Sequence, residues 1–313
     1  ATLTLEDSSI TGGVIKNFGT IDLTGDSSFS GLSSFVNEGT LEAEGTLTLT
    51  GMTINNAGHI LKSSGSGVID LVNTIINGGT LGGKIQTASP NKSSTLNGVT
   101  LAFGTLVTAA FGVLELTGTI FNYGEIDATA GALDLDNATV NGGTFGGHGT
   151  IATASGNSDS ILSGVTVASG STVTAAVGTL DLTGITTNNG EIDATTGALH
   201  LHNATVIGGT LGGAGTIATD SLNQFSILKN VTIAAVTKVS ASAGVLELTG
   251  AINDHGVIDA TTGTIELINA DIIGGTLGGD GTITTASAFN TFNGVTIASG
   301  TTVEVADGTA LDL

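Results

Sequence analysis

The chain has 313 residues, with 27 acidic and 6 basic side chains, and its formal net charge at pH 7 is −21. This acidity argues against nucleic-acid and anionic-membrane partners, which are bound through cationic side chains, and the absence of cysteine excludes disulfides and thiolate metal sites. The 50 glycines, the single proline and the 40% hydrophobic residues are typical of an all-β chain with many tight turns.

Short runs that alternate apolar and polar residues recur along the chain, and we expect each to be a strand. In chain order the clearest runs are 1–5, 114–117, 199–202, 245–248, 265–267 and 310–313. A period of two places Leu199 and Leu201 on one face of a strand and His200 and His202 on the other. Glycine or asparagine separates such runs, which predicts short strands joined by tight corners and no helices.

The chain also contains a long internal repeat. A Gly-Gly-Thr-Leu-Gly-Gly hexapeptide, with phenylalanine at the fourth position in one copy, occupies 78–83, 142–147, 208–213 and 274–279. A weaker copy begins at Gly12, so the copies follow one another along the chain at a nearly constant step. A shorter period lies inside this unit, because an asparagine motif at Asn17 returns at Asn37 and again at Asn56.

These periods predict a solenoid. If three coils share each 66-residue unit, a coil has roughly 22 residues, the length of one three-strand turn of a parallel β-helix. We therefore expect an all-β, right-handed parallel β-helix of about 14 coils with a three-coil super-repeat, because parallel crossovers are usually right-handed. The expected organisation is a single solenoid segment over residues 1–313. Strand-like runs at both ends indicate a fragment of a longer repetitive chain.

Two sets of asparagines hold fixed places in the repeat and are expected to be structural. The first set is Asn56, Asn122 and Asn188, and the second is Asn73, Asn137, Asn203 and Asn269. For the first set, the simplest interpretation is a corner residue with a left-handed backbone. The alternative is a ladder of side-chain amides between neighbouring coils.

Paired carboxylates are the candidates for glycosidase-type or lyase-type catalysis. Asp134 with Asp136, and Glu125 with Asp127, are such pairs. One repeat after the first pair, histidines replace both aspartates, and a position that changes from coil to coil does not build one cleft. We interpret the pairs as solvated strand faces. We therefore predict that the chain is not an enzyme and has no catalytic or cofactor-binding residue.

His200 and His202 are the sharpest candidates for a metal site. Two histidines on one strand face can chelate a divalent ion, but a third ligand must come from a neighbouring coil. The corresponding position one repeat earlier offers Asp134 and Asp136. These aspartates would lie three coils away from the histidines, a distance of about 14 Å at the spacing of paired strands. We therefore expect no metal site. Loose calcium binding by the acidic surface stays open, although the calcium-binding nonapeptide motif is absent.

The Gly-Gly-Thr-Leu-Gly-Gly-x-Gly-Thr-Ile run, the Asn-x-Gly-x-Ile-Asp motif and the Leu-x-Leu-Thr-Gly strands carry a family resemblance. The chain resembles bacterial large repetitive surface proteins, which include autotransporter passengers, filamentous-haemagglutinin-like exoproteins and giant secreted adhesins. The resemblance covers nearly the whole chain. It implies a right-handed parallel β-helix that is exported to the cell surface and acts as a stalk, an adhesin or a fibre.

The functional expectation is a non-enzymatic structural segment of an extracellular or cell-surface bacterial protein. One alternative is an adhesive passenger that binds a glycan or protein of a host or neighbouring cell on its side face. Another is a polysaccharide-active β-helix lyase or hydrolase. Such a solenoid can also associate end to end with other copies, because the strand edges at its ends are unpaired. No run of 18 apolar residues is present, so this segment is not expected to insert into a membrane.

Overall fold

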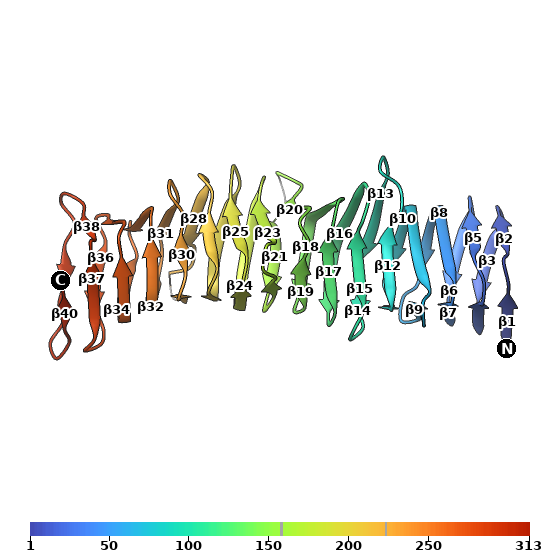
Figure 1. Ribbon diagram of the computed structural model, residues 1–313, viewed down its shortest axis with the longest axis horizontal. Helices are drawn as coiled ribbons and strands as arrows, with labels where there is room; N and C mark the ends of the chain where they lie inside the picture. Colours follow the sequence, from blue (N-terminus) through green and yellow to red (C-terminus); the bar gives the residue numbers. More distant parts are fainter. Residues whose placement is uncertain (157–158, 223) are drawn as a thin grey trace. The chain divides into compact units, whose positions relative to one another are not determined.

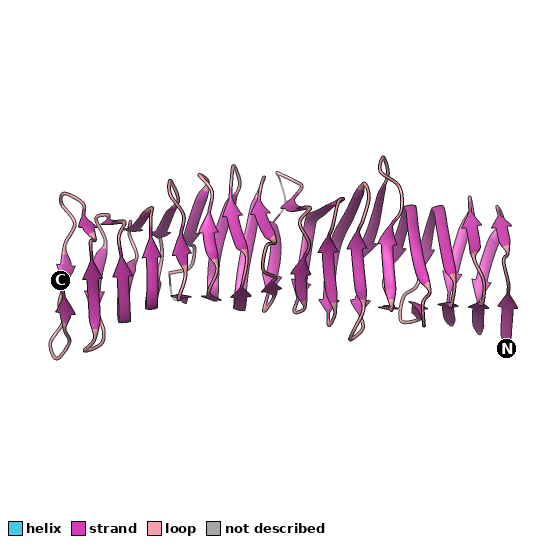
Figure 2. Ribbon diagram, viewed as in Figure 1, coloured by secondary structure: helices cyan, strands magenta, loops and turns pink. Residues whose placement is uncertain are grey.

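The structure is a computed structural model, and it describes residues 1–156, 159–222 and 224–313. The chain divides into two compact units, Ala1–Ala152 and Thr153–Leu313. Each unit is a parallel β-solenoid, as the sequence predicts, and together they hold about 15 turns. Figure 2 shows strands joined by short turns, with no helix in the part of the chain that is described. It follows that no helix among those residues is long and apolar enough to cross a membrane.

In the first unit the strands form three parallel ladders, one for each side of the coil (Figure 1). The first ladder contains β1 (Thr2–Leu5), β4 (Thr20–Leu23), β7 (Thr40–Ala43), β9 (Ile60–Ser63), β11 (Thr80–Gly82) and β14 (Thr100–Leu101). The second contains β2 (Ser9–Thr11), β5 (Ser27–Ser30), β12 (Lys84–Thr87), β15 (Leu106–Ala109), β17 (Glu125–Ala128) and β19 (Thr144–Gly146). The third contains β3 (Val14–Asn17), β6 (Ser34–Asn37) and β13 (Ser93–Asn97). Four strands bend at a corner and belong to two ladders each: β8 (Thr46–Asn55), β10 (Val68–Asn77), β16 (Val113–Asn122) and β18 (Ala132–Asn141).

The second unit is built in the same way, and β20 (Thr150–Thr153) includes the division between the units. Its first ladder contains β21 (Asp159–Ser163), β28 (Thr216–Thr219), β31 (Lys238–Ala241), β33 (Val257–Ala260), β35 (Thr276–Gly278) and β38 (Thr296–Ile297). Its second contains β22 (Thr166–Val167), β29 (Phe225–Lys229), β36 (Thr282–Thr285) and β39 (Val303–Glu304). Its third contains β23 (Thr172–Ala175), β25 (Glu191–Ala194), β27 (Thr210–Gly212), β30 (Thr232–Ile233), β37 (Asn290–Asn293) and β40 (Leu311–Asp312). The bent strands are β24 (Thr179–Asn188), β26 (Ala198–Ile207), β32 (Val245–Asp254) and β34 (Thr264–Ile273).

The alternation of residues in each strand fixes what faces the core. In β26, Leu199 and Leu201 are buried in the centre of the coil, whereas His200 and His202 lie on the outer side. Strands of the inner turns therefore stabilise the unit by burying their apolar residues inside the coil. Burial of a leucine side chain contributes about 1.5–3 kcal/mol.

The ten-residue strands bend where the backbone becomes left-handed. The φ angle is 52° at Asn137 in β18 and at Asn203 in β26, and it is 65° at Gly118 in β16 and at Gly184 in β24. The register between neighbouring strands shifts at these corners. Asparagine and glycine adopt this conformation with the least strain, which explains why glycine stands at the corners of β16 and β24 and asparagine at those of β18 and β26.

The long repeat is not a whole number of turns. Thr20 pairs with Thr40 and Thr40 with Ile60, so strands of neighbouring turns lie about 20 residues apart in the sequence. In the second unit, the repeat that runs from the start of β24 to the start of β32 forms ten sides: two each from β24 and β26, and one each from β25 and β27 to β31. Ten sides are three and a third turns. The predicted coils are confirmed, since the solenoid has about 15 turns with strands about 20 residues apart, but the long repeat spans three and a third of these turns and not three.

The extra third of a turn moves each copy of the repeat to the next side of the coil. The first half of β24 pairs with β26 and belongs to the first ladder. The first half of β32, which is the next copy of the same sequence, pairs with β29 and belongs to the second ladder. Residues that correspond in the repeat therefore face different directions, and spatial neighbours must be found from the 20-residue turn.

Candidate functional site

The outer face of the second unit's first ladder brings together an imidazole and two carboxylates. His200 lies on β26, directly opposite Asp181 on the preceding strand β24. On the other side of β26 lies β28, and Asp220 follows its last residue. Three successive turns thus supply Asp181, His200 and Asp220, whose ligand atoms all lie within 4.8 Å of one another.

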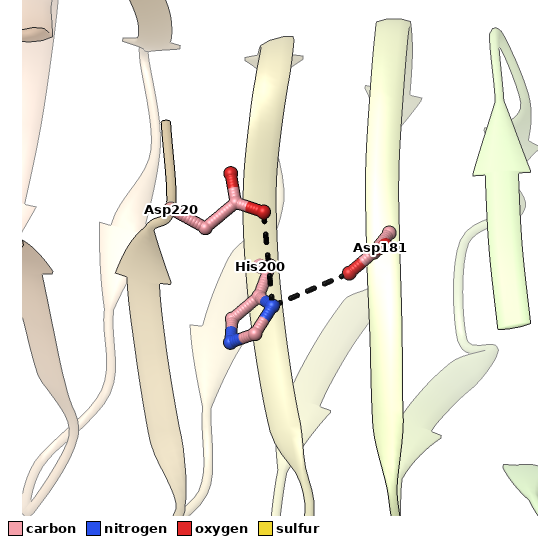
Figure 3. A group of neighbouring side chains, drawn as sticks. All are labelled: Asp181, His200 and Asp220. Carbon is pink, nitrogen blue, oxygen red and sulfur yellow. Dashed lines mark ion pairs between the residues drawn. The ribbon is translucent and has the colours of Figure 1, made fainter. Parts of the chain in front are cut away.

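The ring of His200 lies between the two carboxylates (Figure 3). Its Nδ1 atom is 3.4 Å from Oδ1 of Asp181 and 3.9 Å from Oδ2 of Asp220. The Asp181 oxygen is itself buried and makes no hydrogen bond of good geometry. His202, two residues along β26, holds its Nδ1 atom 3.0 Å from Oδ1 and 3.1 Å from Oδ2 of Asp220.

The carboxylates determine the protonation of His200. Interaction with Asp181 is the largest cause that raises the pKa of His200, and the charges of Asp220 and Asp159 act in the same direction. Partial burial lowers the pKa but is outweighed. The cluster therefore attracts positive charge, either as a proton on the imidazole or as a cation beside it.

His200 and His202 were predicted from the sequence as metal candidates, whereas Asp181 and Asp220 were not. Asp181 lies one turn before His200 in the sequence, and Asp220 lies one turn after it. The long repeat relates the two histidines to Asp134 and Asp136, whereas the shorter turn relates them to residues on the adjacent strands. A search at one turn before and after each histidine finds both carboxylates.

The first set of asparagines does not adopt the left-handed backbone that we expected. Asn56, Asn122 and Asn188 have no positive φ angle and are fully buried. Asn56 accepts a hydrogen bond of 2.5 Å from Nδ2 of Asn37, and Asn37 accepts one of 2.7 Å from Nδ2 of Asn17. The amide ladder that we considered as the alternative is present from Asn17 through Asn37 to Asn56.

The later members of this set cap corners instead. Oδ1 of Asn122 accepts the backbone N–H of Gly124 at 2.9 Å, and Oδ1 of Asn188 accepts that of Gly190 at 3.1 Å. Asp254 holds the same place and accepts the N–H of Gly256. The buried side chain thus satisfies a backbone donor at the corner, which explains why only asparagine or aspartate occupies the position.

The second set of asparagines does have left-handed backbones. The φ angles of Asn73, Asn137, Asn203 and Asn269 lie between 50° and 53°. Each marks the bend of a ten-residue strand. A separate ladder of asparagines, Asn55, Asn77 and Asn97, runs along the outer surface with hydrogen bonds of 3.2 and 3.0 Å.

The paired carboxylates lie on outward-facing positions, and several have raised pKa values. Burial, and then the charge of Glu125, raises the pKa of Asp127. The same causes, with Glu191 as the neighbour, raise the pKa of Asp193 to about 6. A Cβ atom on Gly212, in the next turn, would clash with Oδ1 of Asp193, so this carboxyl group packs over a glycine. The same contact recurs one repeat earlier, at Asp127.

The pKa of Asp134 is also raised, but by different neighbouring carboxylates. Burial raises its pKa most, followed by the charges of Glu115 and Asp136. Glu115 lies directly opposite Asp134 in the ladder. A carboxyl group with a raised pKa beside a carboxylate is what a general acid requires. Here, however, the arrangement arises from the stacking of acidic strand faces.

No family model, curated protein or solved structure matches the chain. The structure by itself identifies a repetitive β-solenoid.

Proposed function

We propose that this chain is a non-enzymatic structural segment of a secreted bacterial cell-surface protein, where it serves as a stalk, fibre or adhesin scaffold. The observation that supports the proposal most is the continuity of the ladders. Among the described residues of each unit, the strands pair with those of the turn before or after, and the inward residues are buried except in the first and last turns of the chain. Such stacking distributes the load over many parallel hydrogen bonds. The bacterial cell surface is proposed as the location because the coil motifs resemble those of bacterial repetitive surface proteins.

A stalk must resist tension, so force spectroscopy on the intact chain tests this proposal. We expect turns to unfold one after another, and each 20-residue turn should release roughly 70 Å of extended chain. A single low-force event without steps would contradict a load-bearing role. Cleavage of a uronate-containing or neutral polysaccharide with measurable turnover would contradict the non-enzymatic part.

Exposed aromatic residues support a second candidate function, adhesion by the side face. Phe103 and Tyr123 lie at corners of adjacent turns in the first unit and are 95% and 61% exposed. Together with Glu125 and Thr144 they line a shallow hollow of about 330 Å³. Aromatic faces beside a carboxylate are suited to stacking against a sugar ring and accepting its hydroxyl hydrogens.

A glycan array distinguishes adhesion from a purely structural role. We expect the wild-type chain to bind a restricted set of glycans, and the double variant Phe103→Ala/Tyr123→Ser to lose that binding. Phe289, which is 80% exposed in the second unit, provides the matched control, because Phe289→Ala removes an exposed aromatic away from the hollow. Equal binding by all three proteins would contradict the adhesive candidate.

A further inference from the structure

We propose that Asp181, His200 and Asp220 bind a divalent transition-metal ion, and that His202 holds Asp220 in place. This site goes beyond the structural role proposed above and does not depend on it. Among the described residues, these side chains form a group in which histidine and carboxylate ligand atoms converge from three successive turns (Figure 3).

The distances are close to those that a metal ion requires. Ligand atoms bound 2.0–2.1 Å from a tetrahedral ion lie about 3.3 Å apart. The two separations from Nδ1 of His200 are 3.4 Å to Asp181 and 3.9 Å to Asp220. All three ligand atoms lie within 4.8 Å of one another, so the side chains must draw closer together around an ion, while paired strands of the ladder hold the positions from which they extend.

The chemistry of the donor atoms favours a transition metal over calcium. An imidazole nitrogen suits Zn²⁺, Cu²⁺, Ni²⁺ and Co²⁺, whereas Ca²⁺ takes oxygen ligands. Two carboxylates balance the charge of a divalent ion. Oδ1 of Asp181, which makes no hydrogen bond of good geometry, keeps a lone pair available.

Binding exchanges a proton for the metal ion at Nδ1 of His200. This atom faces both carboxylates and lies at ion-pair distance from each. Nε2 points away from Asp181 and Asp220 (Figure 3) and retains its own proton when the metal binds. The Nδ1–H bond of a protonated imidazole breaks and its proton passes to the solvent, while the ion exchanges bound water for Nδ1 of His200 and one oxygen each of Asp181 and Asp220.

His202 contributes as a positioning residue. Its Nδ1 atom contacts both oxygens of Asp220, at 3.0 and 3.1 Å. Histidine or carboxylate partners in the second layer around a metal orient its ligands, and their loss typically costs about 10–100-fold in affinity. Because Asn203 turns the backbone at the next residue, His202 is the last side chain of β26 that faces this side of the coil.

The long repeat does not reproduce this group, which indicates a specific site and not a general property of the coil. The residues that correspond to His200 are Asp134 and Glu266, and neither is a histidine. The copies also face other sides of the coil, so each has different neighbours.

Isothermal titration of the intact chain with Zn²⁺, at about pH 7.5 in roughly 0.3 M NaCl to screen the acidic surface, tests the proposal. We expect one ion per chain. Asp181→Asn and His200→Gln should each weaken binding at least tenfold, with a smaller loss for His202→Gln. His59→Gln, which removes a histidine of the first unit, should leave the affinity unchanged.

Two results would overturn the proposal. One is unchanged zinc affinity in His200→Gln, a substitution of an outward-facing residue whose folding circular dichroism can verify. The other is displacement of zinc by an equal concentration of Ca²⁺, which would assign binding to surface carboxylates alone. A chemical-shift change at the His200 imidazole on adding Zn²⁺, absent for His59, would independently support the site.

Discussion

At the scale of single residues, Asp193 couples protonation to folding. Its pKa is raised from 3.8 to about 6 by burial and then by Glu191. The folded state therefore binds a proton that the unfolded chain releases between about pH 4 and pH 6, and its stability falls as the pH rises through that window. In urea unfolding, we expect a higher free energy of unfolding at about pH 4.5 than at about pH 7.5, and Asp193→Asn to reduce the difference. After solvent screening, the reduction should be on the order of 1 kcal/mol.

The control for this prediction must separate Asp193 from the general repulsion of an acidic chain. Asp280→Asn removes the same unit of charge from an exposed position. We expect it to leave the pH dependence nearly as it is in the wild type. If the two variants change the pH dependence equally, the total charge and not the environment of Asp193 governs it.

The buried amide ladder gives a second prediction. Asn37 lies between Asn17 and Asn56, and it also donates to the backbone carbonyl of Ile60 at 3.0 Å. Asn37→Ala leaves buried polar partners unsatisfied, so the free energy of unfolding should fall by about 2–3 kcal/mol. Asn77→Ala, in the middle of the outer asparagine ladder, should cost less than about 0.5 kcal/mol, because water replaces the lost hydrogen bonds. Denaturant unfolding of both variants measures the contrast, and equal losses would show that burial does not matter here.

At the scale of strands, the left-handed corner of β18 gives a third prediction. Asn137 has a φ angle of 52°, and Gly118 holds the equivalent corner in β16. Asn137→Gly should change the free energy of unfolding by only a few tenths of a kcal/mol, whereas Asn137→Val should lower it by about 1–2 kcal/mol through backbone strain. Chemical denaturation of the two variants supplies the comparison. A valine variant as stable as the glycine variant would mean that the corner tolerates a different backbone.

The strands were predictable from sequence because their faces follow a period of two. Leu199 and Leu201 are buried and His200 and His202 face outward, as the alternation indicates. The bent strands were harder to predict, because one left-handed residue such as Asn203 lets the chain turn a corner without leaving the ladder. A long bent strand and two short strands with a corner then have the same pattern in the sequence.

The candidate metal site was only partly predictable from the sequence, because the corners between strands differ in length. The step between paired residues of neighbouring turns is shorter from Asp181 to His200 than from Thr216 to Lys238. Corners of different length cause this variation, and no single period locates the neighbours of a given side chain. The sequence therefore indicates which residues face outward, but not which of them meet across the ladder.

At the scale of the whole chain, the mismatch between repeat and turn distributes the surface chemistry. Each copy of the long repeat begins one side further round the coil than the copy before it, as β24 and β32 show in the second unit. Acidic and aromatic positions that recur in the sequence therefore do not form one continuous stripe. This arrangement suits a scaffold that has to remain soluble, because repeated like charges are kept on different sides.

A deletion of one complete repeat tests whether each copy of the repeat begins one side further round the coil than the copy before it. Removing residues 179–244 joins Gly178 to Val245, and β32 then takes the place of β24, because β21 pairs with β24 as β29 pairs with β32. We expect the shortened chain to keep the circular dichroism per residue and cooperative unfolding of the parent, but to lose the zinc site. Removing 179–238, which is three turns of about 20 residues, brings non-equivalent residues together at the junction and should cause aggregation or loss of cooperativity. If this second deletion folds as well as the first, stacking depends on the number of turns alone, and the long repeat has no structural role of its own.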